Sequence, residues 1–160
     1  MSQRLEPGDI APEFVLPTVS GTVSLDGLLE QAEAGVIVYF YPRAATPGCT
    51  TQACDFQDSY AALKSAGYRL VGISPDPVDK LEAFAETESL GFPLASDPDK
   101  TTLEAYGAYG EKKNYGKVVK GVIRSTIIIS PDGTVAHALY NVKATGHVAR
   151  IEKLLGITQG

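Results

Sequence analysis

The strongest constraint on the fold is a continuous apolar run at residues 36–41, Val-Ile-Val-Tyr-Phe-Tyr. A run rich in β-branched and aromatic residues, without polar alternation, is typical of a central strand that is covered on both faces. Pro42 ends this run, and Pro47 suits the first turn of a helix. We expect that helix to continue to about Ser65, because Gly67 can then close its end. A buried strand, a short turn and a long helix therefore organise the chain.

The remaining segments predict an α/β fold of thioredoxin-like order, with a central mixed sheet flanked by helices. Residues 69–74 form a second buried run, and Asp76-Pro77 opens a helix after it. Pro131-Asp132-Gly133 predicts a hairpin turn between two late strands. The other expected elements are strands at 14–16, 22–25, 92–95, 122–130 and 134–140, and helices after Asp26, at 100–106 and at 145–155.

Two expectations concern the C-terminal half of the chain. Residues 107–120 are rich in lysine and glycine, so we interpret them as a basic loop. We expect its lysines to be solvated, with the docking of an acidic partner as the alternative. The final helix is amphipathic, and its inward-facing residues are expected to be Val148, Ile151, Leu154 and Leu155.

Length and composition indicate a single globular domain over residues 1–160. Apolar residues make up 44% of the chain and charged residues 21%, which is typical of a chain that buries a core. The formal net charge of −5 argues against nucleic acid as a partner. No apolar run approaches the roughly 18 residues of a membrane span. The N-terminal residues form no apolar signal segment, so we expect a cytoplasmic protein without a membrane partner.

Both cysteines of the chain, Cys49 and Cys54, lie in the expected turn and helix. A thiol is a good nucleophile only as the thiolate, and the positive end of a helix dipole favours that charged form. Cys49 falls in the first turn, beside unpaired backbone amides. Gly48 lets the backbone approach a ligand closely, and the Thr46 hydroxyl can exchange a hydrogen bond with a small polar substrate. This setting favours a reactive Cys49, and the alternative is a buried apolar cysteine.

The spacing of the two cysteines limits how they can pair. On an ideal helix five residues rise about 7.5 Å and turn about 140°, which puts the two Cα atoms roughly 8 to 9 Å apart. A disulfide needs a Cα separation below about 7 Å and converging Cβ vectors. Cys49 and Cys54 therefore cannot bond while both lie in intact helix. Either the pair is never bonded, or the start of the helix must unwind.

The same cysteines fit other cysteine chemistries poorly. The spacing C-x4-C is not the C-x-x-C of thioredoxin, which disfavours a disulfide-exchange enzyme of that type. It is also a poor zinc half-site, because no second pair of ligands is evident. His137 and His147 lie far along the chain, and we expect a surface or capping role for both. No metal site is predicted.

Arg124 interrupts an apolar segment, residues 122–129. An arginine in such a strand needs a partner or must line a site, since a buried unpaired charge is costly. If the late hairpin packs beside the strand that ends at Tyr41, the guanidinium could reach Cys49, hold its thiolate and orient a substrate. The alternative is an edge-strand arginine in solvent.

Several segments carry a family resemblance. Residues 39–56 read Tyr-Phe-Tyr-Pro-Arg-Ala-Ala-Thr-Pro-Gly-Cys-Thr-Thr-Gln-Ala-Cys-Asp-Phe and contain the pattern Pro-x-x-x-Thr-x-x-Cys. Further segments are Gly-Asp-Ile-Ala-Pro-Glu-Phe at 8–14, Phe-Pro-Leu-Ala-Ser-Asp-Pro at 92–98, Gly-Glu-Lys-Lys-Asn-Tyr-Gly-Lys at 110–117 and Arg-Ser-Thr at 124–126. Along nearly its whole length the chain resembles peroxiredoxins of the bacterioferritin comigratory protein (peroxiredoxin Q) family.

The resemblance implies a thioredoxin-like fold and a role for each motif residue. Cys49 matches the peroxidatic cysteine of the family. Thr46 and Arg124 match its polar partners, and Pro42 matches the residue that shields it. Cys54 matches the resolving cysteine that many members, but not all, carry in the same helix.

The chain departs from the family pattern at the turn. Members often carry lysine where Arg43 stands, and some carry an acidic residue where Ala44 and Ala45 stand. The first difference keeps the positive charge. The second is expected to alter the contacts of the loop.

By this resemblance, the Cys49 thiolate attacks hydrogen peroxide or an organic hydroperoxide, and the resulting sulfenic acid condenses with Cys54 to an intrachain disulfide. Thioredoxin or a similar dithiol then reduces the disulfide, and no metal or cofactor is required. An intrachain disulfide needs no second subunit, so we expect a monomer, with a weak dimer as the alternative. Two other functions stay open: a thiol-disulfide oxidoreductase, and a non-catalytic thioredoxin-fold binding module that docks through residues 111–120.

Overall fold

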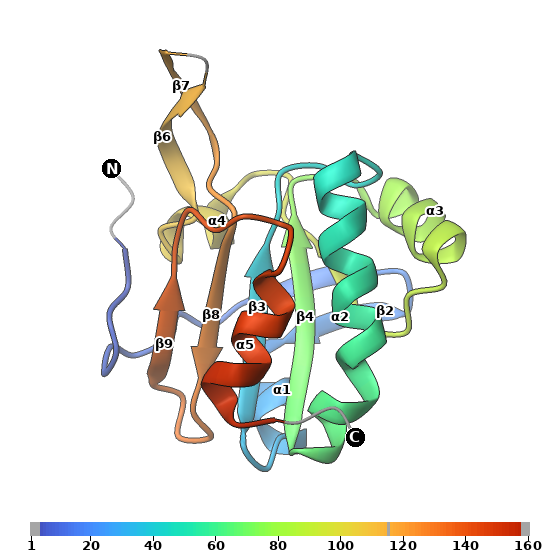
Figure 1. The fold of residues 1–160 in the computed structure, drawn as a ribbon, viewed down its shortest axis with the longest axis vertical. Coiled ribbons are helices and arrows are strands. Elements are labelled where there is room, and N and C mark those ends of the chain that lie inside the picture. Colours follow the sequence, from blue (N-terminus) through green and yellow to red (C-terminus); the bar gives the residue numbers. More distant parts are fainter. Residues whose placement is uncertain (1–3, 115, 158–160) are drawn as a thin grey trace.

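The computed structural model describes residues 4–114 and 116–157. Its centre is a five-stranded mixed sheet in the order β5-β4-β3-β8-β9 (Figure 1). β3, β4 and β5 run parallel, whereas β8 and β9 run antiparallel to their neighbours. The bounds of these strands are β3 Gly35–Phe40, β4 Tyr68–Ser74, β5 Leu94–Ser96, β8 Ser125–Ile129 and β9 Val135–Leu139. The expected α/β fold with a central mixed sheet flanked by helices is therefore confirmed.

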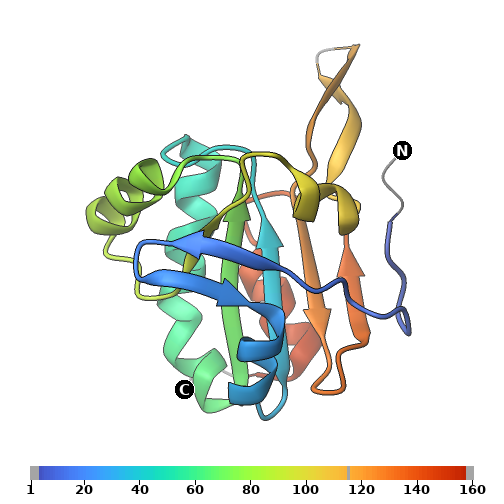
Figure 2. The same ribbon diagram turned by 180° about the vertical axis from the view of Figure 1, so that it is seen from behind.

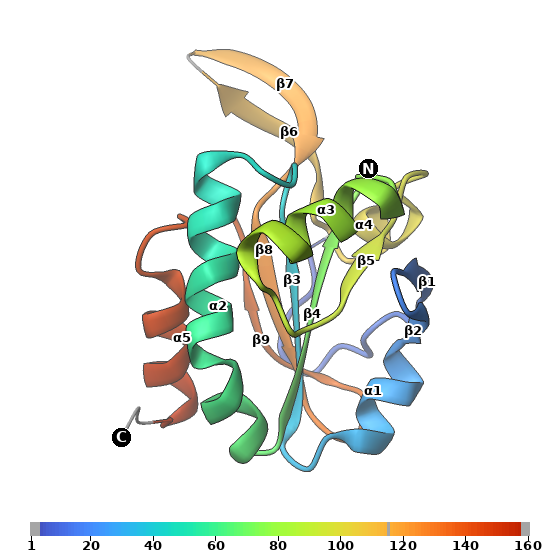
Figure 3. The ribbon, with the colours of Figure 1, turned by 90° about the vertical axis from the view of Figure 1, so that its right-hand side faces the viewer.

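Both faces of this sheet are covered, as the edge-on view in Figure 3 shows. α2 (Pro47–Ser65) and α5 (His147–Leu155) lie on one face. α1 (Leu25–Gln31) and a ribbon of β1 (Val15–Thr18) and β2 (Gly21–Ser24) lie on the other, which Figure 2 shows from behind. α3 (Val78–Glu88) packs beside β5, and the short α4 (Thr101–Ala105) follows β5 in the chain. Within the described part of the chain, no helix has the length and apolar character that crossing a bilayer requires.

β3 is buried along its whole length, because its alternate side chains enter two different cores. Val36 and Phe40 point to the face that is covered by α1 and the β1–β2 ribbon. Ile37 and Tyr39 point to the opposite face, where α2 and α5 pack. The Tyr39 ring stacks on Phe56 of α2 with a distance of 4.5 Å between ring centroids. This double burial explains why the sequence shows no polar alternation here.

The turn between β3 and α2 ends, and the helix begins, at the residues that the sequence indicates. Thr46 is the N-cap residue, with an extended ψ of 154°, and Pro47 begins the helix. Ala45, just before the cap, has a φ of 66°, a left-handed conformation that costs a non-glycine residue about 1–2 kcal/mol. α2 ends at Ser65, and Gly67 follows with a φ of 94°. The helix therefore has the bounds that the sequence predicts.

The interpretation of residues 107–120 as a loop is wrong. Most of them form a second ribbon, β6 (Tyr109–Asn114) and β7 (Lys117–Val122), which turns at Gly116 with a φ of 79°. This ribbon projects from the body of the protein (Figures 1 and 3). β7 is largely exposed, so no apolar alternation marks it as a strand. The segment expected as one strand at 122–130 is split as well, since Val122 ends β7 and Ser125 begins β8.

Fewer side chains of α5 are buried than the sequence predicts. Val148 and Ile151 are buried and Leu155 is half-buried, as predicted. Leu154, in contrast, is 43% exposed. Positions 148, 151 and 155 recur at helical spacing and already form the stripe that faces the sheet, so position 154 lies at its flank.

His147, the first residue of α5, is buried, which corrects the expectation of a surface or capping role. It is 3% exposed, and its Nε2 lies 2.8 Å from the hydroxyl of Thr126 in β8. Burial, together with the positive charges of Arg150 and Arg124, lowers the pKa of His147 to about 4. A neutral imidazole therefore links α5 to the sheet. His137 lies in β9 and is half-buried.

Gly72 of β4 lies opposite Tyr39 of β3, and a Cβ atom at Gly72 would come within 2.8 Å of the Tyr39 ring. We expect Gly72→Ala to lower the free energy of unfolding by about 1–3 kcal/mol, because the buried ring has no room to move aside. Urea unfolding measures the change. The control is Gly110→Ala in β6, whose Cβ would have its nearest neighbour at 3.9 Å. Equal stability of the two variants would contradict the close approach of β3 and β4 described here.

The lowered pKa of His147 predicts a loss of stability in acid. The unfolded chain binds a proton at this histidine below the ordinary pKa of 6.5, whereas the folded chain does so only below about 4. The free energy of unfolding should therefore fall as the pH drops from about 6.5 to about 4. His147→Gln, which cannot be protonated, should show a shallower fall in urea unfolding over this range. Parallel curves for the two proteins would show that His147 is not the group responsible.

Candidate active site

The sheet topology brings Arg124 and Cys49 together. β8 pairs with β3, and Ser125 lies opposite Phe40 at the end of β3, just before the turn to α2. Arg124, the residue before β8, therefore lies beside the first turn of α2. Its Nη2 donates a hydrogen bond to Sγ of Cys49 at 3.2 Å, and Cys49 is 1% exposed. The guanidinium and the N-terminus of α2 both place positive charge beside the sulfur, which would stabilise a thiolate.

Gln52 is a site residue that the sequence reasoning did not identify. It is fully buried in α2, and its Oε1 accepts a hydrogen bond from Nη1 of Arg124. The guanidinium is therefore held at two points, by a sulfur and by an amide oxygen. Nε2 of Gln52 has no hydrogen-bond partner among the described residues. The available signal was a polar residue one helical turn after Cys49, on the side of the helix that faces the sheet.

Thr46 and Pro42 lie on the turn before α2 and border a surface cavity of about 420 Å³. The Thr46 hydroxyl donates to the carbonyl oxygen of Arg43 at 3.0 Å and does not cap the helix. Pro42 is half-buried. The cavity does not include Cys49 itself. A small molecule in it would lie against Pro42 and Thr46, and Thr46 precedes Cys49 by three residues.

The Asp76 carboxylate, which precedes α3, binds the turn between β3 and α2. Its Oδ2 accepts hydrogen bonds from the backbone N–H of Ala44 at 2.6 Å and from the Ser74 hydroxyl at 3.1 Å. The Asp76 carbonyl oxygen accepts from the Ser96 hydroxyl at 2.6 Å. The sequence indicated Asp76 only as the start of a helix. The structure shows that it also connects the end of β4 to the turn that carries Thr46.

Cys54 has different surroundings from Cys49. Its thiol donates to Oε1 of Glu88 in α3 at 3.8 Å, and its side chain is half-buried. Burial raises the pKa of Cys54, and the carboxylates of Glu88 and Asp58 raise it further. Both cysteines are free, and α2 is continuous between them. The structure therefore shows the helical arrangement in which the spacing forbids a disulfide.

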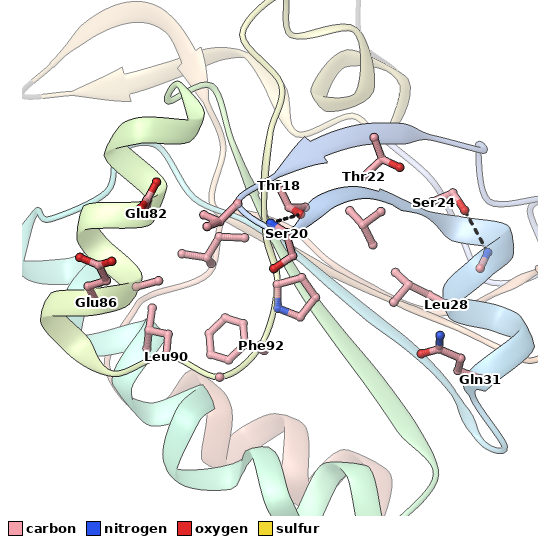
Figure 4. A pocket seen from close by; sticks show the side chains of 17 residues that line it. Thr18, Ser20, Thr22, Ser24, Leu28, Gln31, Glu82, Glu86, Leu90 and Phe92 are labelled. Carbon is pink, nitrogen blue, oxygen red and sulfur yellow. Dashed lines mark hydrogen bonds between the residues drawn. The ribbon is translucent and has the colours of Figure 1, made fainter.

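A larger hollow, of about 570 Å³, lies away from the cysteines. It is bordered by the β1–β2 ribbon, α1 and α3, and Figure 4 shows Ser24, Leu28, Glu82 and Phe92 around it. Neither the cysteines nor Arg124 line it. The candidate site therefore rests on the contacts of Cys49 and not on the size of a cavity. In residues 4–114 and 116–157, no three side chains of His, Cys, Asp or Glu gather into a possible metal site.

The sequence is similar to known protein sequences, and these similarities identify its family. A model of the AhpC/TSA family matches residues 7–138. A Mycobacterium tuberculosis protein that carries a peroxiredoxin name is 54% identical over 155 residues, covering 96% of this chain and 97% of its own length. Peroxiredoxin Bcp of Escherichia coli K12 is 44% identical over 144 residues, covering 89% of this chain and 90% of its own length.

Solved structures show the same fold. The bacterioferritin comigratory protein of Xanthomonas campestris, studied for alkyl peroxide reduction, has a TM-score of 0.81 at 34% identity, covering 89% of this chain and 90% of its own. Peroxidoxin BcpB of Mycobacterium tuberculosis has a TM-score of 0.81 at 33% identity, covering 96% of this chain and 97% of its own. The chain therefore belongs to the AhpC/TSA family, and it is a thiol peroxidase of the peroxiredoxin type.

Proposed function

We propose that Cys49 is the peroxidatic cysteine of this peroxidase. Its thiolate attacks one oxygen of a hydroperoxide, so that an S–O bond forms and the O–O bond breaks. The other oxygen leaves as alkoxide, or as hydroxide from hydrogen peroxide, and takes up a proton to become alcohol or water. Cys49 is thereby oxidised by two electrons to a sulfenic acid, and the peroxide is reduced by two electrons.

The observation that carries this proposal is the hydrogen bond from Arg124 to a buried Cys49 sulfur at the start of a helix. A guanidinium in that position can hold the thiolate and then stabilise charge on the leaving oxygen. The amides of the first turn of α2 can do the same. Thr46 and Pro42 lie in the turn that leads to Cys49 and border a surface cavity, which supports a polar role for Thr46 and a shielding role for Pro42.

We assign Cys54 as the resolving cysteine. Its thiol attacks the sulfenic sulfur, the S–O bond breaks, and the hydroxyl leaves with the thiol proton as water. The first turns of α2 must unwind before this step, because the intact helix holds the two Cα atoms too far apart. The contacts of Arg124 with Gln52 and of Cys54 with Glu88 hold those turns and have to break.

The peroxiredoxin family implies a peroxide substrate and a thiol reductant. Our proposal for the reductant is thioredoxin or a similar dithiol, which attacks the disulfide and restores both thiols. We further propose one domain that acts as a monomer, since an intrachain disulfide needs no second subunit. A cytoplasmic location fits a cysteine pair that is reduced in every cycle.

Two serine variants separate the roles of the cysteines. Cys49→Ser should consume no peroxide with thioredoxin as donor, because serine supplies no thiolate. Cys54→Ser should lose thioredoxin-driven turnover but still consume about one peroxide per chain, because the first step does not need Cys54. Peroxide consumption and NADPH oxidation, followed together with thioredoxin and its reductase, measure both quantities.

The same assay decides between the alternatives. Peroxide turnover by Cys49→Ser would overturn the proposal as a whole, and full turnover by Cys54→Ser would overturn its resolving role. A thiol-disulfide oxidoreductase would instead reduce protein disulfides with little peroxide consumption. A non-catalytic binding module would retain its partner in Cys49→Ser.

Arg124→Lys keeps the positive charge but loses the forked guanidinium that reaches Cys49 and Gln52 together. We expect the second-order rate constant for Cys49 oxidation to fall about a hundredfold, as for other losses of one donor that stabilises developing charge. Rapid quenching, alkylation and mass spectrometry measure the loss of the free Cys49 thiol. Arg150→Lys, exposed on α5, is the matched control and should keep the wild-type rate. An unchanged rate in Arg124→Lys would remove Arg124 from the mechanism.

A further inference from the structure

The hollow of about 570 Å³ that lies away from the cysteines, here named the ribbon cavity, is enclosed by segments from four parts of the chain. The β1–β2 ribbon, α1 and α3 form its walls, and residues 90–94, which lead into β5, lie between them (Figure 4). Its volume falls within the range of about 300–1,000 Å³ that is typical of pockets for small organic ligands. The proposed chemistry of Cys49 makes no use of this space.

Apolar side chains border the ribbon cavity. Leu28, Phe92 and Leu94 are buried residues of the two cores. Val19, in the turn between β1 and β2, also borders the cavity and is 48% exposed. A carbon skeleton in the cavity would remove apolar surface from water, which is favourable in proportion to the area covered. The cavity therefore suits a ligand with an apolar body.

In the described part of the chain, every charged side chain that borders the ribbon cavity is acidic. Glu82 and Glu86 are exposed residues of α3, and Figure 4 shows them along one edge of the hollow. They are four residues apart, a spacing at which two like charges destabilise a helix. The last turn of α3 contains no basic residue to compensate the negative end of the helix dipole. A cation at this edge would offset both effects.

Neutral acceptors complete the polar lining. The hydroxyl groups of Thr18 and Ser20 and the amide of Gln31 border the cavity, and each has an oxygen that can accept a hydrogen bond. An ammonium group has only donors, so it can use these oxygens together with the two carboxylates. An anionic ligand would meet the carboxylates and, among the described residues, no positive side chain. The polar lining therefore favours a cation.

We propose that the ribbon cavity binds small organic cations, with an apolar body against Leu28 and Phe92 and an ammonium group beside Glu82 and Glu86. The site is separate from Cys49, so the inference does not depend on the peroxidase reaction. Binding is reversible and includes no chemical step. The two exposed carboxylates add modestly to the affinity, and added salt weakens their contribution because it screens the charges.

Three ligands of similar shape test the role of charge. Phenylbutylamine, phenylbutanol and phenylbutyrate share a phenyl ring on a short alkyl chain, and at neutral pH they are cationic, neutral and anionic. Titration of each into the isotope-labelled chain, followed by amide NMR, measures the affinity and the location together. The amine should bind about tenfold more tightly than the alcohol at low ionic strength, and the carboxylate more weakly than either. Saturable shifts should centre on the amides of Ser20, Leu90 and Gly91, which border the cavity.

Single variants then locate the binding. Glu82→Gln and Glu86→Gln should each weaken binding of the amine about threefold, the scale expected of one exposed ion pair, and should leave binding of the alcohol unchanged. Glu104→Gln, exposed on α4, removes the same charge from another surface and should change neither affinity. Ala85, which is half-buried and borders the cavity, tests the space itself. Ala85→Leu should abolish saturable binding of both the amine and the alcohol, while amide signals away from the cavity keep their positions.

Each outcome decides the inference. Equal affinities for the amine and the alcohol would overturn it, as would Glu82 and Glu86 variants that bind the amine as tightly as the wild-type protein does. Shifts that do not saturate, or that centre on residues away from the ribbon cavity, would overturn it as well. None of these results bears on Cys49, whose role is tested by its own serine variant.

Discussion

The hydrogen bond between the Arg124 guanidinium and the Cys49 sulfur ties the central sheet to the N-terminal end of α2. It exists because β8, a strand late in the sequence, lies beside β3 in the interior of the sheet and not at its edge. The same guanidinium holds Gln52, so one side chain fastens the first turns of the helix to the sheet. The charge beside the sulfur and the integrity of the helix therefore depend on the same contacts.

Local signals in the sequence were sufficient for the strand and helix that carry Cys49. An apolar run buried on both faces and a helix bounded by proline and glycine are visible without knowledge of the fold. The role of Gln52 could not be predicted from local signals alone, because its partner, Arg124, lies 72 residues away along the chain. His147 was misjudged for the same reason, since its burial depends on packing against β8. The β6–β7 ribbon was missed because largely exposed strands carry no apolar pattern.

The proposed mechanism sets two requirements that one conformation cannot meet. Attack by Cys49 benefits from an intact N-terminus of α2, whereas a bond to Cys54 needs that end unwound. The two hydrogen bonds of the Arg124 guanidinium resist unwinding, each by up to about 3 kcal/mol. The 3.8 Å contact of the Cys54 thiol with Glu88 adds less, because a thiol is a weak donor. The left-handed backbone of Ala45 acts in the opposite direction, because unwinding can relieve its strain. Formation of the disulfide has to offset the difference between these two effects.

Amide hydrogen exchange along α2 tests this central claim most directly, by comparing the reduced protein with protein oxidised by stoichiometric peroxide. The account predicts that amides of residues 49–56 lose protection on oxidation while those of residues 58–65 keep it. Mass spectrometry on the same sample verifies the bond between Cys49 and Cys54. Unchanged protection along the whole helix in a protein that carries this disulfide would contradict the account.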